Sequence, residues 1–545
     1  MVRVRPAGLL ASAVLAALAA AGCGDQPVAP AAVVGEVSLA PGAYVLYGGR
    51  RAAGPLQFPA GGADTAEYLV VGQFATGQAD VSEGFSLAGS LPAAPTTAAG
   101  ASAGPAELPA ALRFHDAIRR MDEAAALASL RMPPGRAAPA RVAPPAVGSQ
   151  RTFRVCASLD CSTTASVTAT ATVVGLHSAI YVDAAAPSGG FTASDLGQLS
   201  AQFDHDLYPV DTLAFGAPSD VDGNGIVIIL LTPRVNALVG RPACQSSFVT
   251  GFFLAADLAP ATRASYNDGE VFYAMVPDPA GTVSCPHSAG EVEQLIAPTF
   301  IHEFQHMISF NQHVLVRRGP PEALWLNEAM SHLAEELGGR HYDSASGGGD
   351  TATAARFLFG DLYNAYLYLL NPAAHAVITT EGTDNLEQRG AQWLFLRYLV
   401  DRFGPATTRR LEQTSLTGAT NVVAAAGNTP IASLIGHWGL SLFLSGLPAF
   451  APDSELAFVS WRLRATYDSL HTHDAGTFTM PYPLAPAGVS GGAFRVVGTV
   501  SSGSGSYVDI VVAPGQPLFT LTFTSPGGLA LNGGGNPQLA IVRLR

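Results

Sequence analysis

The stretch His302-Glu303-Phe304-Gln305-His306 is an HExxH motif. Two histidines four residues apart on an α-helix lie about 40° apart around the axis and about 6 Å apart along it, so both imidazoles can reach one metal ion. We therefore expect His302 and His306 to be zinc ligands. Glu303 would then face a zinc-bound water, on which a carboxylate can act as general base.

The third zinc ligand has two candidates downstream of the motif. A metzincin site requires a histidine six residues after the motif and a glycine three residues after it, whereas this chain has Gln312 and Ser309 there. His313 comes one residue too late for that pattern. Glu328 lies on a predicted helix over 322–337, which a loop can fold antiparallel to the first helix, and it is the better candidate.

At these two helices the chain resembles the gluzincin metallopeptidases, whose HExxH helix is followed by a second helix carrying Asn-Glu. The sequences His-Glu-Phe-Gln-His-Met and Trp-Leu-Asn-Glu are most similar to the hyicolysin-type neutral metallopeptidases of bacteria. The resemblance covers residues 200–405 and implies a zincin-like α+β catalytic domain. It also implies that His302, His306 and Glu328 bind zinc and that Glu303 is the base.

The resemblance leaves the surroundings of the metal site open. Thermolysin-like enzymes place an aspartate four residues after the ligand glutamate, and this chain has His332 there. Glu335 or Glu336, one turn further, could orient a ligand histidine instead. We expect His313 and His332 to be surface or core histidines. The general acid or oxyanion donor has four unranked candidates: Tyr363, Tyr366, His341 and Tyr342.

A second metal signal lies at Asp220, Asp222 and Asn224, which alternate along the chain and precede Gly225 as in the start of an EF-hand loop. The twelfth position is Leu231 instead of glutamate, and no helix is predicted to follow. A tight turn is therefore favoured over a calcium site.

The N-terminus has the features of an export signal. A basic start is followed by the apolar run 7–21, and Ala20-Ala21-Gly22-Cys23 resembles a bacterial lipobox with Ala20 in place of the usual leucine. We expect residues 1–22 to be a signal peptide and Cys23 to carry a lipid, which predicts a cell-envelope lipoprotein. Ordinary cleavage nearby, giving a secreted protein, and an uncleaved anchor are the alternatives.

Four cysteines remain after Cys23, an even number in a chain sent to an oxidising compartment. By proximity in sequence we expect Cys156 to pair with Cys161 and Cys244 with Cys285; two other pairings, and four free thiols, are the alternatives.

The composition narrows the classes of partner. The formal charge is −13, from 42 acidic residues against 29 basic ones that are all arginine, and no basic run is present. This balance argues against nucleic acid and against an anionic membrane surface, so the membrane is expected to enter only through the lipid anchor. The expected partner is a protein or peptide substrate.

Changes in composition divide the chain into several domains, and the expected fold class is α+β. We expect a small β-domain at 33–90, a Pro/Ala/Gly-rich linker or pro-segment at 91–148 with one helix at 109–130, and the metallopeptidase domain at 149–450. A C-terminal β-module follows at 455–545.

Within the metallopeptidase domain, the HExxH helix is predicted to begin at Pro298, and the helix over 322–337 to stop at Gly338-Gly339. Two further helices are expected at 354–370 and 388–403.

The function expected from these features is that of a secreted or surface-anchored zinc endopeptidase. Two alternatives remain: a surface binding or adhesion lipoprotein that keeps a non-proteolytic zincin fold, and a zinc hydrolase of non-peptide substrates. The first would be indicated by a missing base or ligand, and here His302, Glu303, His306 and Glu328 are all present.

Overall fold

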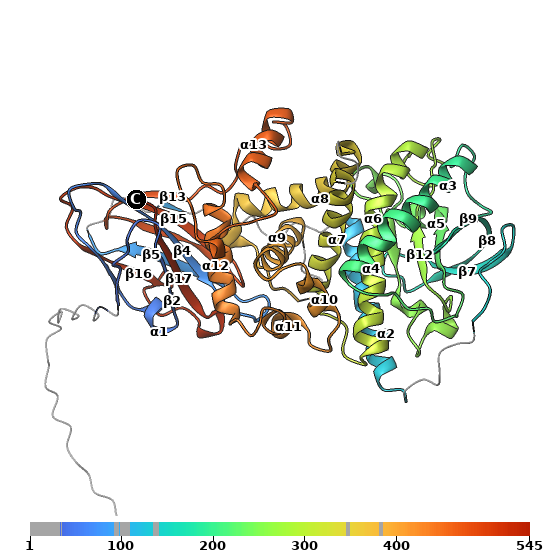
Figure 1. Cartoon of the computed structure of the whole chain (residues 1–545), viewed down its shortest axis with the longest axis horizontal. Coiled ribbons are helices and arrows are strands. Elements are labelled where there is room, and N and C mark those ends of the chain that lie inside the picture. Colours follow the sequence, from blue (N-terminus) through green and yellow to red (C-terminus); the bar gives the residue numbers. More distant parts are fainter. Residues whose placement is uncertain are drawn as a thin grey trace, which may run out of the picture. The chain divides into compact units, whose positions relative to one another are not determined.

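The computed structural model describes residues 33, 35–91, 97–98, 109–133, 141–344, 349–380 and 385–545 (Figure 1). The predicted signal peptide and Cys23 lie outside this part of the chain, as does much of the predicted linker. The described residues form a mixed α+β structure with three sheets, so the predicted class agrees with the structure. No helix among them is long and apolar enough to span a membrane.

The first sheet to consider has six strands in the order β11-β12-β10-β9-β8-β7. Its strands are β7 (Gln150–Cys156), β8 (Thr164–Val174), β9 (Ser178–Asp183), β10 (Val227–Leu231), β11 (Gly251–Phe253) and β12 (Val271–Ala274). The wholly apolar β10 is buried along its length and pairs in parallel with β9 and β12. The edge strand β11 runs antiparallel to β12, and it borders the site described below.

Helices cover this sheet and continue beyond it in Figure 1. The larger ones are α2 (Ala110–Leu130), α3 (Ala193–Gln202), α6 (Ala289–Ser309), α7 (Leu324–Ser344), α8 (Thr351–Leu370), α9 (Leu386–Phe403), α12 (Ile431–Leu444) and α13 (Leu463–His473). The shorter ones are α1 (Arg50–Ala53), α4 (Tyr208–Ala214), α5 (Pro233–Ala237), α10 (Ala406–Glu412) and α11 (Gly418–Ala425). The expectations for α2, α8 and α9 agree with these bounds to within three residues.

Two predicted helix boundaries are wrong. The HExxH helix α6 begins at Ala289, because Ser288 and Glu291 form a capping box there, and Pro298 lies inside the helix. Helix α7 runs through Gly338-Gly339 to Ser344. A Cβ at Gly338 would lie 3.0 Å from the Phe357 ring, so this glycine allows α8 to approach closely and does not end the helix.

The predicted N- and C-terminal β-modules are one module, which corrects the expectation of two. One of its sheets has the order β13-β15-β4-β17-β2 and the other β1-β3-β16-β5-β14-β6. The N-terminal segment supplies β1 (Gly35–Glu36), β2 (Tyr44–Gly48), β3 (Leu56–Phe58), β4 (Ala66–Phe74), β5 (Ser82–Gly89) and β6 (Thr97–Ala98). The C-terminal segment supplies β13 (Ala487–Ser490), β14 (Arg495–Ser501), β15 (Gly505–Val512), β16 (Phe519–Thr524) and β17 (Pro537–Arg543).

Strand β4 shows why the two segments depend on each other. It lies between β15 and β17 and pairs with both, with Val70 opposite Val508 on one side and Ile541 on the other. All three side chains belong to one buried cluster shared by the two segments. Neither segment could bury these side chains alone.

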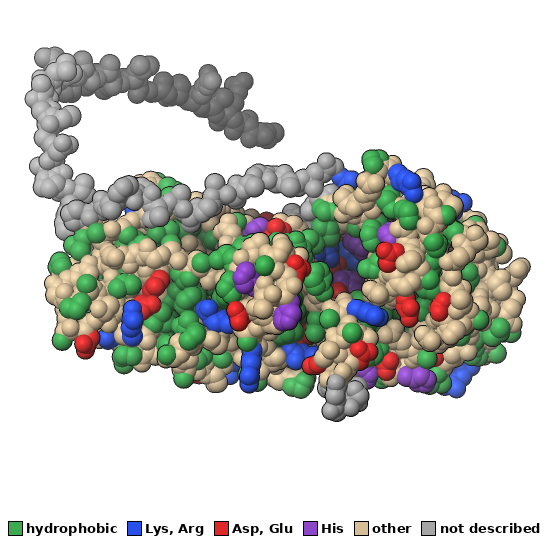
Figure 2. Space-filling model, turned by 90° about the horizontal axis from the view of Figure 1, so that it is seen from above, with side chains coloured by type: hydrophobic (Ala, Val, Ile, Leu, Met, Phe, Trp, Pro, Cys, Tyr) green, Lys and Arg blue, Asp and Glu red, His purple; other side chains and the backbone are tan. Residues whose placement is uncertain are grey.

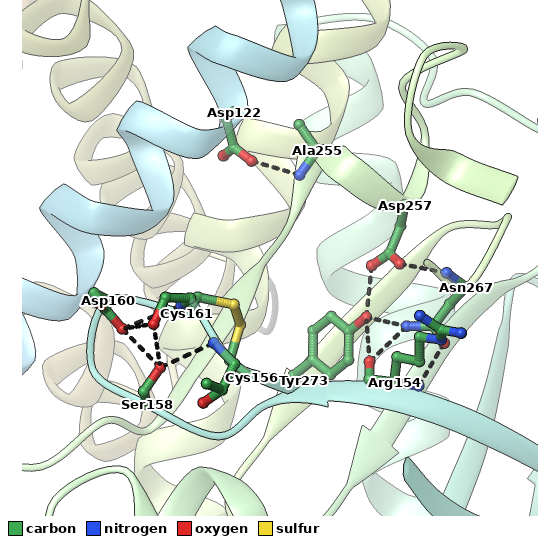
Figure 3. Close-up of a disulfide and its surroundings, with 12 residues drawn as sticks. Asp122, Arg154, Cys156, Ser158, Asp160, Cys161, Ala255, Asp257, Asn267 and Tyr273 are labelled. Atoms are coloured by element: carbon green, nitrogen blue, oxygen red, sulfur yellow. Dashed lines mark hydrogen bonds between the residues drawn. A yellow bond between two sulfur atoms is a disulfide. The ribbon is translucent and has the colours of Figure 1, made fainter. Parts of the chain in front are cut away.

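Both predicted disulfides are present, Cys156–Cys161 and Cys244–Cys285. Figure 3 shows the first of them in the turn after β7. Disulfides are typical of proteins in oxidising compartments, which fits an extracellular location.

Candidate metal centre

Two helices that pack against each other, α6 and α7, bring the predicted zinc ligands together. The rings of His302 and His306 lie one turn apart on α6, with centroids 4.9 Å apart. Glu328 on α7 reaches both of them. Its Oε2 is 3.6 Å from His302 Nε2 and its Oε1 is 3.5 Å from His306 Nε2.

These separations suit a zinc ion. Atoms bound to zinc at 2.0–2.2 Å with tetrahedral angles lie about 3.3–3.6 Å from one another. His306 is 2% exposed, and both of its ring nitrogens are buried without a hydrogen-bond partner. A metal ion would satisfy Nε2, so the residues present fit the group.

The orientation of His302 is fixed from the side away from Glu328. Its Nδ1 lies 2.7 Å from Glu335 Oε1, so the structure selects Glu335 from the two predicted orienting residues. Glu336 instead accepts hydrogen bonds from Arg340 and from the indoles of Trp393 and Trp461.

His332 extends this support instead of lying on the surface. Its Nδ1 is 2.9 Å from Asp361 Oδ1 and 3.1 Å from Glu335 Oε1. Burial alone would lower the pKa of His332, but its hydrogen bonds to Asp361 and Glu335 outweigh burial and raise the pKa to about 10. The imidazolium therefore holds Glu335 in place. His302, His332 and Glu335 also form a group that could hold a metal, which is the alternative use of the same side chains.

Glu328 is paired with a buried cation that the sequence did not reveal. Arg389 Nη1 on α9 lies 2.5 Å from Glu328 Oε2, and both side chains are almost fully buried. Burial would raise the pKa of Glu328, but the Arg389 charge and the neighbouring histidines hold it well below its usual range. Glu328 is therefore ionised, as a metal ligand must be.

Glu303 lies beside the two histidines, with ligand atoms of all three within 4.8 Å of one another. Its Oε2 accepts a hydrogen bond from the backbone N–H of Phe253 at 2.9 Å and from Arg119 Nη2 at 2.7 Å. Arg119 belongs to α2, in the segment predicted to be a linker or pro-segment. His115, one turn earlier on α2, has Nδ1 3.7 Å from Glu303 Oε1.

No local pattern predicts the contacts of Arg119 and Arg389, since each is separated from its partner by more than sixty residues. Asp361, the partner of His332, is likewise contributed by another helix. A sequence signal did exist for α2 itself, because its apolar spacing predicts a helix.

The remaining predicted candidates have other partners. His313 is buried, and its Nε2 lies 3.8 Å from Glu322 Oε2. Tyr342 and His341 contact Asp206, and Tyr366 contacts Thr479 and the Met480 backbone. Tyr363 packs against Phe359 and Phe478.

A cavity of about 280 Å³ adjoins the centre between α2, α6 and the start of α7. Arg119 and Asp122 line it on one side and His306 and Asn327 on the other. Figure 2 shows a hollow on one face of the described chain, with basic, acidic and histidine side chains inside it.

The Asp220 loop makes a separate cluster. Asp220, Asp222 and Glu270 place carboxylate oxygens within 4.8 Å of one another. Glu270, just before β12, is 2% exposed, and its Oε2 is buried without a hydrogen-bond partner. Glu270 lies outside the loop, directly before β12, so the loop sequence alone could not identify it.

No protein-family model matches the chain. A similar protein is the neutral metalloprotease ShpI of Staphylococcus hyicus, which is 30% identical over 146 residues. That match covers 27% of this chain and spans 30% of the staphylococcal protein. The chain is thus similar to a metalloprotease over part of its length.

Proposed function

We propose that this protein is a zinc-dependent endopeptidase of gluzincin type. The observation that carries the proposal is the convergence of His302 Nε2, His306 Nε2 and the Glu328 carboxylate at 3.5–3.6 Å, with Glu303 next to them. The partial similarity to a neutral metalloprotease supports the peptide bond as the bond that is cleaved.

A zinc ion held by His302, His306 and Glu328 would supply a Lewis acid that polarises the scissile carbonyl and stabilises negative charge on its oxygen. The protein's own residues supply the proton transfer. Glu303 takes a proton from the attacking water as general base and passes it to the leaving amine as the C–N bond breaks. Glu335 fixes His302, and Arg389 keeps Glu328 ionised.

We further propose that the chain is exported and held at the cell envelope through Cys23, and that its partner is a protein or peptide. The two disulfides support export, and the acidic composition without a basic run argues against nucleic acid as the partner. Metabolic labelling with a fatty acid should label the wild type and leave Cys23→Ser unlabelled. Labelling of neither protein would remove the anchor from the proposal.

Zinc content and hydrolysis test the catalytic proposal. Chain purified after growth with zinc should hold about one zinc ion, because His302, His306 and Glu328 together provide the three ligands of one catalytic site. A peptide library should be cleaved internally, cleavage should stop with a chelator, and zinc should restore it. Absence of zinc, together with no uptake on titration, would remove the metal centre. Bound zinc without peptide cleavage in any variant would favour a non-peptide substrate.

We also propose calcium for the Asp220 loop, now with Glu270 as a ligand. The loop contributes Asp220 and Asp222, and the buried, unpartnered Glu270 Oε2 is the observation that favours a cation over a simple turn. Calcium should raise the unfolding temperature of the wild type, but not that of Glu270→Gln. The exposed Asp64 in the β-module offers a control, because Asp64→Asn should keep the full calcium response. No response in the wild type would leave the loop as a turn.

A further inference from the structure

Helix α2 lies across the candidate centre, although it comes from a segment far away in sequence. Its buried face carries Arg119 and Asp122, which are 5% and 7% exposed. We infer that α2 is an internal inhibitor of the peptidase, which occupies the base and the adjoining strand edge until it is displaced. This inference rests on the proposed function, whose site it would regulate.

The first observation is the state of Glu303. A general base needs a carboxylate oxygen free to accept a proton from water. Here Oε2 accepts hydrogen bonds from Arg119 at 2.7 Å and from the Phe253 amide at 2.9 Å. Oε1 has no hydrogen-bond partner, but it is buried away from water, and His115 Nδ1 lies 3.7 Å from it. The buried guanidinium therefore takes a hydrogen-bonding position on Oε2 that a water molecule would otherwise use.

The second observation concerns the strand edge. An extended peptide commonly binds an enzyme by adding to an exposed edge strand, and β11 is the edge of its sheet. Helix α2 covers this edge. Asp122 Oδ1 accepts the Ala255 N–H at 2.6 Å, just after β11, and Phe114 packs edge-on against Phe252 with ring centroids 4.9 Å apart. Figure 3 shows the Asp122–Ala255 contact.

Further contacts hold α2 along its length. Arg119 also pairs with Asp122 at 2.8 Å, which joins the two inhibitory contacts. Ser129 Oγ accepts the Ala261 N–H at 3.2 Å, and Arg318 donates to the Leu130 carbonyl at 3.3 Å. Helix α2 is therefore held in the cleft by polar contacts at several points along its length.

The topology shows what must move for release. Strand β5, before α2 in sequence, pairs with β14 and β16 of the C-terminal segment, and β7, after α2, belongs to the sheet below the site. Loss of the whole N-terminal region would therefore tear strands from the β-module. Activation needs only α2 itself to leave, by displacement or by cuts on its two sides.

Arg119→Ala tests the inference in the full chain. Without the guanidinium, turnover of a chelator-sensitive peptide substrate should rise at least tenfold. A peptide hydroxamate, used as a probe of access to the metal, should bind at least tenfold more tightly by calorimetry. The matched control is Arg120→Ala on the exposed face of α2, which should change neither value. Circular dichroism would establish that both variants fold.

Asp122→Asn is a second test of the inference, which acts through the Ala255 contact and leaves the Arg119 side chain in place. It keeps the side chain's size but weakens the Ala255 contact, so turnover and probe affinity should rise by a smaller factor. Unchanged values in both variants, with zinc bound and the wild type active, would overturn the inference while leaving the peptidase intact.

The other outcomes separate the two proposals. Loss of turnover in Arg119→Ala would make Arg119 part of catalysis and overturn inhibition. Tighter probe binding without peptide cleavage in any variant would support the inhibitor and reject the peptidase. Absence of zinc in every variant would reject the peptidase, and unchanged hydrogen exchange of α2 in Arg119→Ala would then reject docking through Arg119.

Discussion

The two walls of the cleft present opposite kinds of chemistry to the same space. The wall made by α6 and α7 offers buried acceptors, including a His306 nitrogen without a hydrogen-bond partner, which a cation would satisfy. The wall made by α2 offers a buried cation, Arg119, that is already paired with Glu303. The α6–α7 wall has buried acceptors without a hydrogen-bond partner, whereas the α2 wall pairs with Glu303 and closes the other side of the site. Buried charged side chains can thus form a metal centre, and a cation that pairs with the base can keep that centre inactive.

Glu303 lies on the α6–α7 wall and is also bound by Arg119 of the α2 wall, so Glu303→Gln should have the largest effect on the zinc-loaded enzyme. The amide keeps the shape but cannot act as a base, and turnover should fall by roughly 10²- to 10⁴-fold. Zinc content should remain unchanged, because Glu303 is not a predicted ligand. The comparison should be made in the wild type and in Arg119→Ala, so that docking of α2 does not hide the loss. Near-normal turnover in the Glu303→Gln variant would contradict the assignment of the base.

The identity of the third ligand gives the largest expected effect on zinc binding itself. Glu328 lies 3.5–3.6 Å from both histidine nitrogens, whereas His313 faces Glu322. Glu328→Ala should weaken zinc binding by about an order of magnitude or more and abolish turnover. His313→Ala is the matched control and should bind zinc normally, as measured by competition with a coloured chelator. The reverse result would move the third ligand to His313.

The site residues of the α6–α7 wall could be predicted from the sequence because each signal lies within one short stretch of chain. The spacing of His302 and His306 reports a helical face, and the Asn327-Glu328 pair marks the second helix. The α2 wall depends on contacts such as Arg119–Glu303, separated by 184 residues, which no periodicity records. The joint β-module was missed for the same reason, because strand pairing between β4 and β17 is set by tertiary contacts. The start of α6 could have been predicted from a local signal, because Ser288 and Glu291 have the spacing of a capping box.

Removal of the support behind His302 should have an intermediate effect. Glu335→Gln replaces the carboxylate that bonds His302 Nδ1 at 2.7 Å, and groups in this position change metal affinity by roughly 10- to 100-fold. Zinc affinity should fall within that range while the fold is kept. Glu293→Gln, elsewhere on α6, should leave zinc affinity unchanged. An unchanged zinc affinity in the Glu335→Gln variant would mean that His302 is positioned by packing alone.

The smallest expected effect comes from Asp257, beneath the strand edge that α2 covers. Asp257 is fully buried and accepts hydrogen bonds from Tyr273 and Asn267, as Figure 3 shows. Burial raises the pKa of Asp257 to about 7, although these hydrogen bonds act against the rise. A carboxyl whose pKa is higher in the folded than in the unfolded chain takes up a proton on folding, so its contribution to stability declines as pH rises from about 4 to about 7.

Asp257→Asn cannot titrate and should lack this decline. The unfolding temperature of the variant minus that of the wild type should therefore become more positive between pH 5 and pH 8, by a few degrees at most. This difference cancels the contributions of other carboxyl groups. Asp160→Asn, an exposed change beside the Cys156–Cys161 disulfide, should not show the same upward trend. A difference that stays flat between pH 5 and pH 8 would mean that Asp257 is ionised in the folded chain, stabilised by Tyr273 and Asn267 as a fixed anion under the strand edge.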